Sequence, residues 1–146
     1  MDPFDDTYFM KKALIEAETA FSKGEIPVGA VVVSAGRIIA RAYNLTELLN
    51  DVTAHAEMQA ITAAANQLGG KYLDQCTIYI TVEPCTMCAG ALGWAQVGRI
   101  VYGAPDDKRG YCKFAPAALH PKTEVKVGVL EKECSSLMKE FFSLKR

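Results

Sequence analysis

The hydrophobic period of this chain switches repeatedly between that of a helix and that of a strand. Residues 9–21 repeat apolar side chains at helical spacing, and residues 28–42 form two β-branched runs around Ala35-Gly36. A run, a turn and a second run predict a β-hairpin. Because helices and strands that alternate along one chain must cover each other's apolar faces, the pattern predicts a layered α/β domain.

The later segments continue this alternation. Two more helical repeats run up to Leu68 and up to Gly98, and a closing amphipathic helix includes Cys134 and Phe141. Strands are predicted over 76–82, 99–103 and 124–130, with a long loop of some helical potential over 104–122. We expect four reactive side chains to lie in the first turns of two helices: His55, Glu57, Cys85 and Cys88.

Length and composition describe an ordinary globular chain. With 146 residues, 50% hydrophobic and 23% charged, the sequence is not disordered, collagen-like or of low complexity, and we expect residues 1–146 to form a single domain. Residues 1–6 are acidic and lack the features of a signal peptide, and no run approaches the ~20 apolar residues of a membrane span. We therefore expect a cytoplasmic protein with no membrane partner.

The charge is divided unevenly along the chain. Residues 1–98 carry 6 Lys/Arg against 11 Asp/Glu, whereas residues 99–146 carry 10 against 6. A basic last third is compatible with nucleic-acid binding and equally with a solvated lysine-rich surface. The five cysteines are an odd number in a chain with no export signal, so metal binding or burial explains them better than a disulfide framework.

One pair of motifs carries most of the chemistry. His55-Ala56-Glu57 is followed, 27 residues after Glu57, by Pro84-Cys85-Thr86-Met87-Cys88. Two cysteines three residues apart in a first helical turn point the same way, and the helix N-terminus favours the thiolates that a metal binds. A lone Cys-x-x-Cys is also typical of a redox pair, of half a Cys₄ site, or of plain burial. The flanking residues lack the usual redox context, and there is no second Cys-x-x-Cys.

The third ligand comes from a short list, because the chain has only two histidines. His55 stands at a helix start, whereas His120 stands in a loop before Pro121 and is better interpreted as a surface or capping residue. Glu57 follows His55 by two residues and can face a metal-bound water without occupying the metal. Three protein ligands leave a fourth position open, which is the mark of a catalytic zinc site.

This set of residues is similar to the signature of the zinc nucleobase deaminases. Nearly end to end, the chain resembles the bacterial tRNA adenosine deaminases, which make inosine at the wobble position of the anticodon. The matching stretches are residues 25–31, 53–57, 82–91 and 98–104. Two further features, Asp106 to Gly110 and Glu140-Phe141-Phe142 followed by Lys145-Arg146, are similar to the tRNA enzymes in particular.

The resemblance implies a fold, a cofactor and an activity. The fold is a three-layer α/β/α cytidine-deaminase-like sandwich with a mixed sheet of about five strands. The cofactor is one Zn²⁺ per subunit, held between two helix N-termini by His55, Cys85 and Cys88. The activity is hydrolytic deamination of adenosine to inosine in the tRNA anticodon stem-loop, with Glu57 as the proton shuttle, and the implied assembly is a homodimer.

The resemblance also implies substrate contacts. Asn44 hydrogen-bonds the base, although an asparagine at this position also fits a plain turn at a strand end. Asp106 and Lys108 contact the RNA. Phe142 or its neighbour Phe141 stacks near the flipped nucleotide, and the other of the two belongs to the core at this helical spacing. The basic tail neutralises phosphates, which makes binding depend on salt. It consists of Lys139, Lys145 and Arg146.

Two stretches depart from this family pattern. Residues 110–125 are shortened and altered, and Gly93-Trp94-Ala95 is similar to the guanine and cytosine deaminases. The alternative function is accordingly a free-base or nucleoside deaminase, acting on guanine or cytosine with the same zinc and Glu57. A different class of function is a non-catalytic, zinc-stabilised binding module, in which Glu57 has no chemical role.

Overall fold

The two β-branched runs of the N-terminal third pair as the sequence predicts. In this computed structural model, which describes residues 3–145, β1 (Gly29–Ser34) and β2 (Arg37–Tyr43) form an antiparallel hairpin. Its turn is Ala35-Gly36, where both residues have a positive φ, 51° and 76°. The hairpin forms one edge of the sheet.

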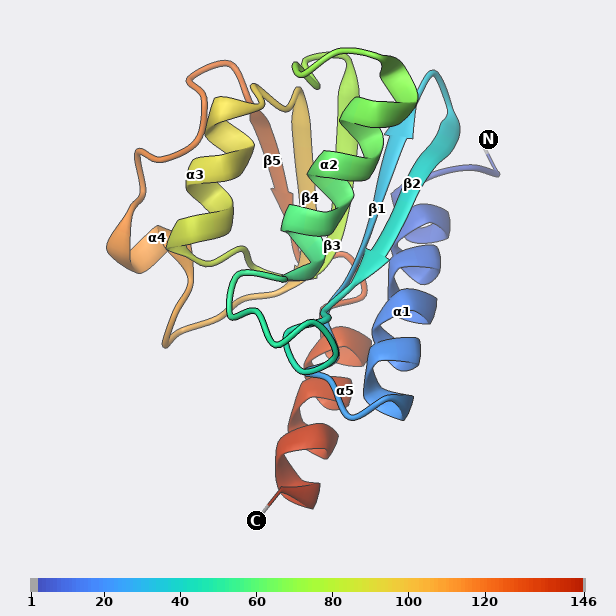
Figure 1. Ribbon diagram of the computed structural model, residues 1–146, viewed down its shortest axis with the longest axis vertical. Helices are drawn as coiled ribbons and strands as arrows, with labels where there is room; N and C mark the ends of the chain where they lie inside the picture. Colours follow the sequence, from blue (N-terminus) through green and yellow to red (C-terminus); the bar gives the residue numbers. More distant parts are fainter. Residues whose placement is uncertain (1–2, 146) are drawn as a thin grey trace.

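The sheet has five strands in the order β2-β1-β3-β4-β5. β3 (Cys76–Val82) is antiparallel to β1, whereas β4 (Arg99–Ala104) and β5 (Glu124–Val127) continue from β3 in parallel. The sheet is therefore mixed, and the prediction of about five strands is confirmed. Figure 1 shows the strands side by side behind α2 and α3.

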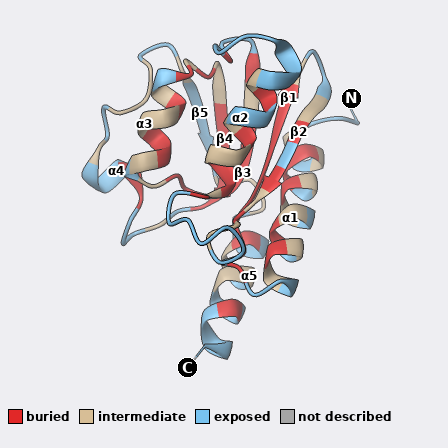
Figure 2. Cartoon of the chain, viewed as in Figure 1, coloured by how far each residue is buried: buried red, intermediate tan, exposed pale blue. Residues whose placement is uncertain are grey.

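Helices cover both faces of the sheet. One layer contains α2 (Ala56–Leu68), α3 (Thr86–Trp94) and the short α4 (Tyr111–Phe114), and the opposite layer contains α1 (Asp6–Ser22) and α5 (Glu131–Leu144). Side chains of β1 alternate between the two cores: Ala30 and Val32 pack with α2 and α3, while Val31 and Val33 pack with α1 and α5. The buried residues follow these two interfaces in Figure 2. This confirms the three-layer α/β/α prediction.

The direction of the strands brings two helix N-termini to one end of the sheet. β2 is antiparallel to β1, and β1 is antiparallel to β3, so β2 and β3 run the same way. The loop after β2 leads into α2, and the turn after β3 leads into α3. Their first turns consequently lie at the same edge, near the loop over residues 44–55 (Figure 1).

The sequence placed some boundaries wrongly. The last strand ends at Val127 and does not reach residue 130, because Gly128 has a φ of 89° and Leu130 one of 55°, which turn the chain into α5. The third helix ends at Trp94 and does not reach residue 98, since Gln96 takes the left-handed conformation with a φ of 55°. The predicted helices and strands all have the predicted type, and only these boundaries differ clearly.

Within residues 3–145, no helix is long and apolar enough to cross a membrane. Arg146, the last residue of the predicted basic tail, lies outside the described residues, as do Met1 and Asp2 at the acidic N-terminus.

One polar cluster ties the first helix to three strands. Asp6 in the first turn of α1 receives two hydrogen bonds from Arg99, both at 2.7 Å, one from Tyr79 at 2.7 Å and one from Lys126 at 3.0 Å. These partners lie on β4, β3 and β5 in turn, and the Asp6 side chain is 17% exposed. The hydrogen bonds from Arg99 are the main reason that the pKa of Asp6 is held well below its usual range.

Replacing Asp6 by Asn is expected to lower the free energy of unfolding at pH 7 by about 2 kcal/mol, because a bidentate, charge-assisted pair is lost. The pKa of Asp6 is lower when folded than when unfolded, so its contribution is fully present above the unfolded value of about 4, begins to fall below that pH, and is lost completely only when pH has passed the lower folded pKa. Urea unfolding of both proteins with EDTA present, at pH 7 and at pH 3, measures this difference. The exposed Asp107→Asn is the control, and a gap between Asp6→Asn and wild type that is equal at both pH values would contradict the assignment.

Candidate active site

His55 is the N-cap residue of α2, one position before the first turn in which the sequence placed it. Its backbone is extended and its side chain makes no capping hydrogen bond. Asn44, at the end of β2, fills that role instead: its Oδ1 accepts the N–H of Ala56 at 2.8 Å. Because Asn44 accepts this N–H at the start of α2, the imidazole of His55 is not needed as a cap and is available to another partner.

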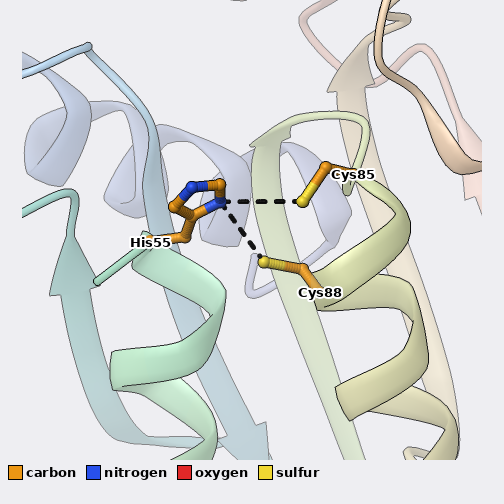
Figure 3. Close-up of side chains that lie close together, drawn as sticks. All are labelled: His55, Cys85 and Cys88. Atoms are coloured by element: carbon orange, nitrogen blue, oxygen red, sulfur yellow. Dashed lines mark hydrogen bonds between the residues drawn. The ribbon is translucent and has the colours of Figure 1, made fainter. Parts of the chain in front are cut away.

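Cys85 occupies the corresponding position at α3. It is the N-cap, extended at φ −73° and ψ 174°, again with no side-chain capping bond, and Cys88 follows in the first turn. Cys85 therefore also stands one position earlier than predicted. Cys88 is completely buried, whereas Cys85 is partly exposed. A helix places residues three apart on one side, so both sulfurs point toward α2, as Figure 3 shows.

The three side chains converge on one point. His55 Nδ1 lies 3.7 Å from Cys85 Sγ and 3.5 Å from Cys88 Sγ, and all three ligand atoms are within 4.8 Å of one another. A tetrahedral zinc ion with bonds of about 2.3 Å to sulfur and about 2.0 Å to nitrogen requires a nitrogen–sulfur separation of roughly 3.6 Å. The observed spacing fits a zinc ion bound by one imidazole and two thiolates.

The thiols and the imidazole are electrostatically coupled. The hydrogen bond with Cys88, followed by that with His55, lowers the pKa of Cys85 to about 4, while the same thiol pair and burial raise the pKa of Cys88. The pKa of His55 is raised, first by its hydrogen bond to Cys85. Cys85 is thus the thiol of the pair that ionises more readily, and the thiolate is the form that binds a metal cation.

Glu57 lies next to this set without belonging to it. It is in the first turn of α2 and 3% exposed, and among the described residues the group that can hold a metal contains only His55, Cys85 and Cys88. Burial raises the pKa of Glu57 to about 7, and the neighbouring charge of Cys85 adds to the effect. A carboxyl group with a pKa near neutrality can both release and accept a proton at physiological pH.

Comparisons with known proteins agree with this geometry. The chain matches the MafB19-like deaminase family over residues 4–146. It is 43% identical over 145 residues to the tRNA-specific adenosine deaminase of Agrobacterium fabrum, which covers 96% of this chain and 95% of that protein. The chain belongs to the tRNA-specific adenosine deaminase family. The observed fold, and the group of His55, Cys85 and Cys88 that we call the zinc-type site, are those expected of a member of this family.

Two solved structures give the same picture for this deaminase. One, from work on A-to-I editing by tRNA:A34 deaminases at the wobble position of transfer RNA, is 43% identical with a TM-score of 0.84 and covers 90% of this chain and 99% of its own. The other, a guanine deaminase from Bacillus subtilis, is 41% identical with a TM-score of 0.66 and covers 72% of this chain and 66% of its own. The likeness to the tRNA:A34 deaminase is the more extensive of these two, so the guanine and cytosine alternative is not favoured.

The residues suggested for substrate contact lie in three different settings in the deaminase. Asn44 is 5% exposed; its oxygen accepts the N–H of Ala56, and its NH₂ group can donate to a further partner. Asp106 is committed to its own turn, where Oδ1 accepts the N–H groups of Lys108 and Arg109, both at 3.0 Å. The Lys108 side chain is exposed.

The C-terminal helix distributes its two phenylalanines as expected. Phe141 is 5% exposed and packs on Phe21 with ring centroids 5.6 Å apart, whereas Phe142 is 45% exposed. Phe141 is therefore the core residue and Phe142 the one on the surface. In the basic tail, Lys139 is exposed, and Lys145 lies over the Phe141 ring at 5.3 Å. His120 stands apart from the zinc-type site: its Nδ1 accepts the N–H of Lys122 at 3.2 Å, as a loop-capping histidine does.

Two buried carboxylates that the sequence did not single out hold the loops around the site. Glu83, 7% exposed, accepts the N–H of Asp106 at 3.0 Å on one oxygen and that of Cys112 at 3.1 Å on the other. Glu25, 2% exposed, accepts the N–H groups of Glu47 at 3.0 Å and Leu48 at 2.9 Å. Each carboxylate accepts hydrogen bonds from residues more than 20 positions further along the chain, so no local pattern predicts this role. For Glu83 the one signal in the sequence is its place next to Pro84-Cys85.

Proposed function

We propose that this protein hydrolyses adenosine to inosine at the wobble position of tRNA with the help of zinc. The observation that carries the proposal is the convergence of His55 Nδ1 with two sulfurs at 3.5 Å and 3.7 Å, beside the buried Glu57. That arrangement stands in a chain 43% identical to a tRNA-specific adenosine deaminase over 96% of its length.

The proposed cofactor is one Zn²⁺ per subunit, held by His55, Cys85 and Cys88. Three protein ligands leave one position open, and zinc in such a site lowers the pKa of water toward 7 and so supplies a nucleophile at neutral pH. The partial exposure of His55 and Cys85 gives solvent and substrate a route to this position.

Glu57 is the proposed proton carrier. In the net reaction, adenosine and water give inosine and ammonia, so one proton must reach the ring nitrogen next to C6 and another must reach the departing amino group. The Glu57 carboxyl, with a pKa of about 7, can take up a proton released from water and deliver it at both stages. Its full burial keeps bulk solvent from competing for that proton.

The proposed binding residues orient the nucleotide. The NH₂ group of Asn44 donates to the base, while its oxygen is bonded to the N-terminus of α2. Lys108 and the tail lysines meet phosphates, Phe142 offers an exposed ring to an unstacked base, and Asp106 shapes the loop that carries Lys108. The RNA partner is the anticodon stem-loop.

We further propose that residues 1–146 form a single deaminase domain that works as a homodimer in the cytoplasm, where tRNA is found. Large apolar side chains that remain exposed support a second copy: Trp94 is 87% and Val52 85% exposed. Sedimentation equilibrium should give twice the chain mass of 15.9 kDa, and a monomer at micromolar concentration would refute the dimer.

The test of function is inosine formation by the zinc-loaded protein on a stem-loop with adenosine at position 34. Free guanine, cytosine, adenosine and cytidine are assayed in parallel by ammonia release. We expect inosine in the RNA only, with a KM that rises with salt because phosphate contacts release counterions. Ammonia from a free base or nucleoside, with the RNA unchanged, would replace this proposal by the small-molecule alternative.

A further inference from the structure

The loop over residues 44–55 carries a proposed functional residue at each end. It begins with Asn44, whose NH₂ group is proposed to donate to the base, and ends with His55, a proposed metal ligand. The two ends lie close together, because the N–H of Leu45 donates to the carbonyl of Ala54 at 2.9 Å. The course of this loop therefore decides how Asn44 is presented beside the zinc-type site.

The first half of the loop is wrapped around the buried carboxylate of Glu25. One oxygen accepts the N–H of Glu47 at 3.0 Å and the hydroxyl of Thr46 at 3.4 Å, and the other accepts the N–H of Leu48 at 2.9 Å. Glu25 lies in the segment between α1 and β1. Hydrogen bonds to an ionised acceptor are stronger than those between neutral groups. The loop thus has a charged anchor that comes from outside the site.

A second contact holds the loop to the same segment. The N–H of Asn44 donates to the carbonyl of Val28 at 3.2 Å, three residues after Glu25. Residues 44–48 are consequently held at two points, one on each side of Leu45, along the stretch that leads from α1 into β1 (Figure 1). If the contact with Glu25 is lost, the backbone of Asn44 can turn about the remaining point.

The direction of the Asn44 NH₂ group depends on that backbone. The side-chain oxygen accepts the N–H of Ala56 at 2.8 Å, which places the oxygen but leaves the NH₂ group free to swing as the backbone turns. A hydrogen bond weakens steeply when its donor is misaligned. A small rotation at Asn44 therefore removes much of the bond to the base.

Burial of apolar side chains does little to hold this loop in its course. Three large apolar side chains of the loop point into solvent: Leu48 is 72%, Leu49 52% and Val52 85% exposed. Side chains that stay in water contribute little hydrophobic stabilisation. The hydrogen bonds to Glu25 and those within the loop are accordingly what keeps it in place.

We infer that Glu25 is a positioning residue for the proposed reaction: by holding residues 46–48 it sets the direction in which Asn44 offers its NH₂ group to the base. This rests on the proposed function and deepens it, because Glu25 acts through Asn44 and not on the substrate itself. His55 is held by α2, which begins at the next residue, so zinc binding should not depend on Glu25.

The test is a double-mutant cycle of Glu25→Gln and Asn44→Asp on the adenosine-34 stem-loop. Glu25→Gln keeps one acceptor oxygen but turns an NH₂ group against an N–H of the loop, so we expect kcat/KM to fall about tenfold. Asn44→Asp can still accept the N–H of Ala56 but cannot donate to the base, and kcat/KM should fall about a hundredfold. If Glu25 acts through Asn44, the double variant should also fall about a hundredfold and not about a thousandfold.

Glu83→Gln is the matched control for this cycle. Glu83 is also a buried carboxylate with an N–H on each oxygen, but it holds Asp106 and Cys112 in a different loop. Its loss should multiply with that of Asn44→Asp, because the two loops contribute independently. Glu47→Gln controls for a change of charge on the loop itself: its side chain is exposed, its backbone N–H remains, and it should keep the wild-type kcat/KM.

Hydrogen exchange gives a readout that does not depend on activity. The backbone N–H groups of Glu47 and Leu48 should exchange about tenfold faster in Glu25→Gln, while those of β1 and β3 keep their wild-type rates. Zinc content should stay at the wild-type value. Assays below the melting temperature of every variant separate a positioning role from a general loss of the fold.

Three results would overturn the inference. A double variant that falls to the product of the two single losses would show that Glu25 acts independently of Asn44. Wild-type kcat/KM in Glu25→Gln would show that Asn44 does not depend on this anchor, and loss of zinc in that variant would assign the effect to His55. A wild-type protein that deaminates no RNA gives a different pattern, in which the proposed function fails and this inference falls with it.

Discussion

Glu57→Gln should lower kcat on the adenosine-34 stem-loop by about 10³-fold, because the glutamine amide cannot carry a proton between water, ring nitrogen and leaving amine. The side chain keeps its size, and the buried site loses a carboxyl group whose charge burial disfavours. We therefore expect the variant to retain zinc and to unfold at a temperature no lower than wild type. Single-turnover deamination with saturating enzyme measures the chemical step, and elemental analysis measures the metal.

The control for this variant is Glu18→Gln, an exposed change on α1 that should leave the rate unaltered. Activity of Glu57→Gln within a few-fold of wild type would remove Glu57 from the mechanism. If the protein then still bound RNA and zinc, a non-catalytic, zinc-stabilised binding module would be the better description.

Cys88→Ala should abolish zinc binding and activity together. Cys88 is completely buried, so water has poor access to replace its sulfur, and two protein ligands hold zinc far more weakly than three. We expect the zinc content after dialysis to fall from one ion per chain to less than about a tenth. The melting temperature should become insensitive to EDTA, whereas that of wild type falls when the metal is removed.

Cys112→Ser provides the comparison for this loss, because Cys112 is an exposed thiol outside the converging group. It should retain its zinc. Full zinc occupancy in Cys88→Ala would exclude Cys88 from the ligand set. A loss of metal equal in both variants would point instead to general oxidation of thiols.

The helices and their reactive residues were predictable because their signals are local. Apolar spacing sets the start of α2 and α3 to within one residue, and a Cys-x-x-Cys at a helix start fixes the direction of two sulfurs from the helix geometry alone. The error of one residue at His55 and Cys85 also has a local cause: an N-cap and a first-turn residue differ in backbone conformation, which the apolar pattern does not record.

The hydrogen bonds that shape the site were not predictable, since each joins segments far apart in the chain. Asn44 is a plausible turn residue in sequence, and only its contact with Ala56 shows that it caps α2 in place of His55. Glu25 and Glu83 look like surface carboxylates by type, yet both are buried because loop N–H groups surround them.

The amino-acid sequence by itself determined the α/β class, and its resemblance to the zinc nucleobase deaminases suggested the metal-binding side chains and the proton carrier Glu57 as residues to be tested. Periodicity, capping and residue spacing act over a few residues and can be read from the chain. The tertiary structure alone decided how far apart the ligand atoms lie, that Glu57 is fully buried, and that the Glu25 carboxylate holds the loop that begins with Asn44. The distances between the ligand atoms depend on where β2 and β3 end relative to each other in the sheet. Long-range strand pairing of this kind is not encoded in any short stretch of sequence.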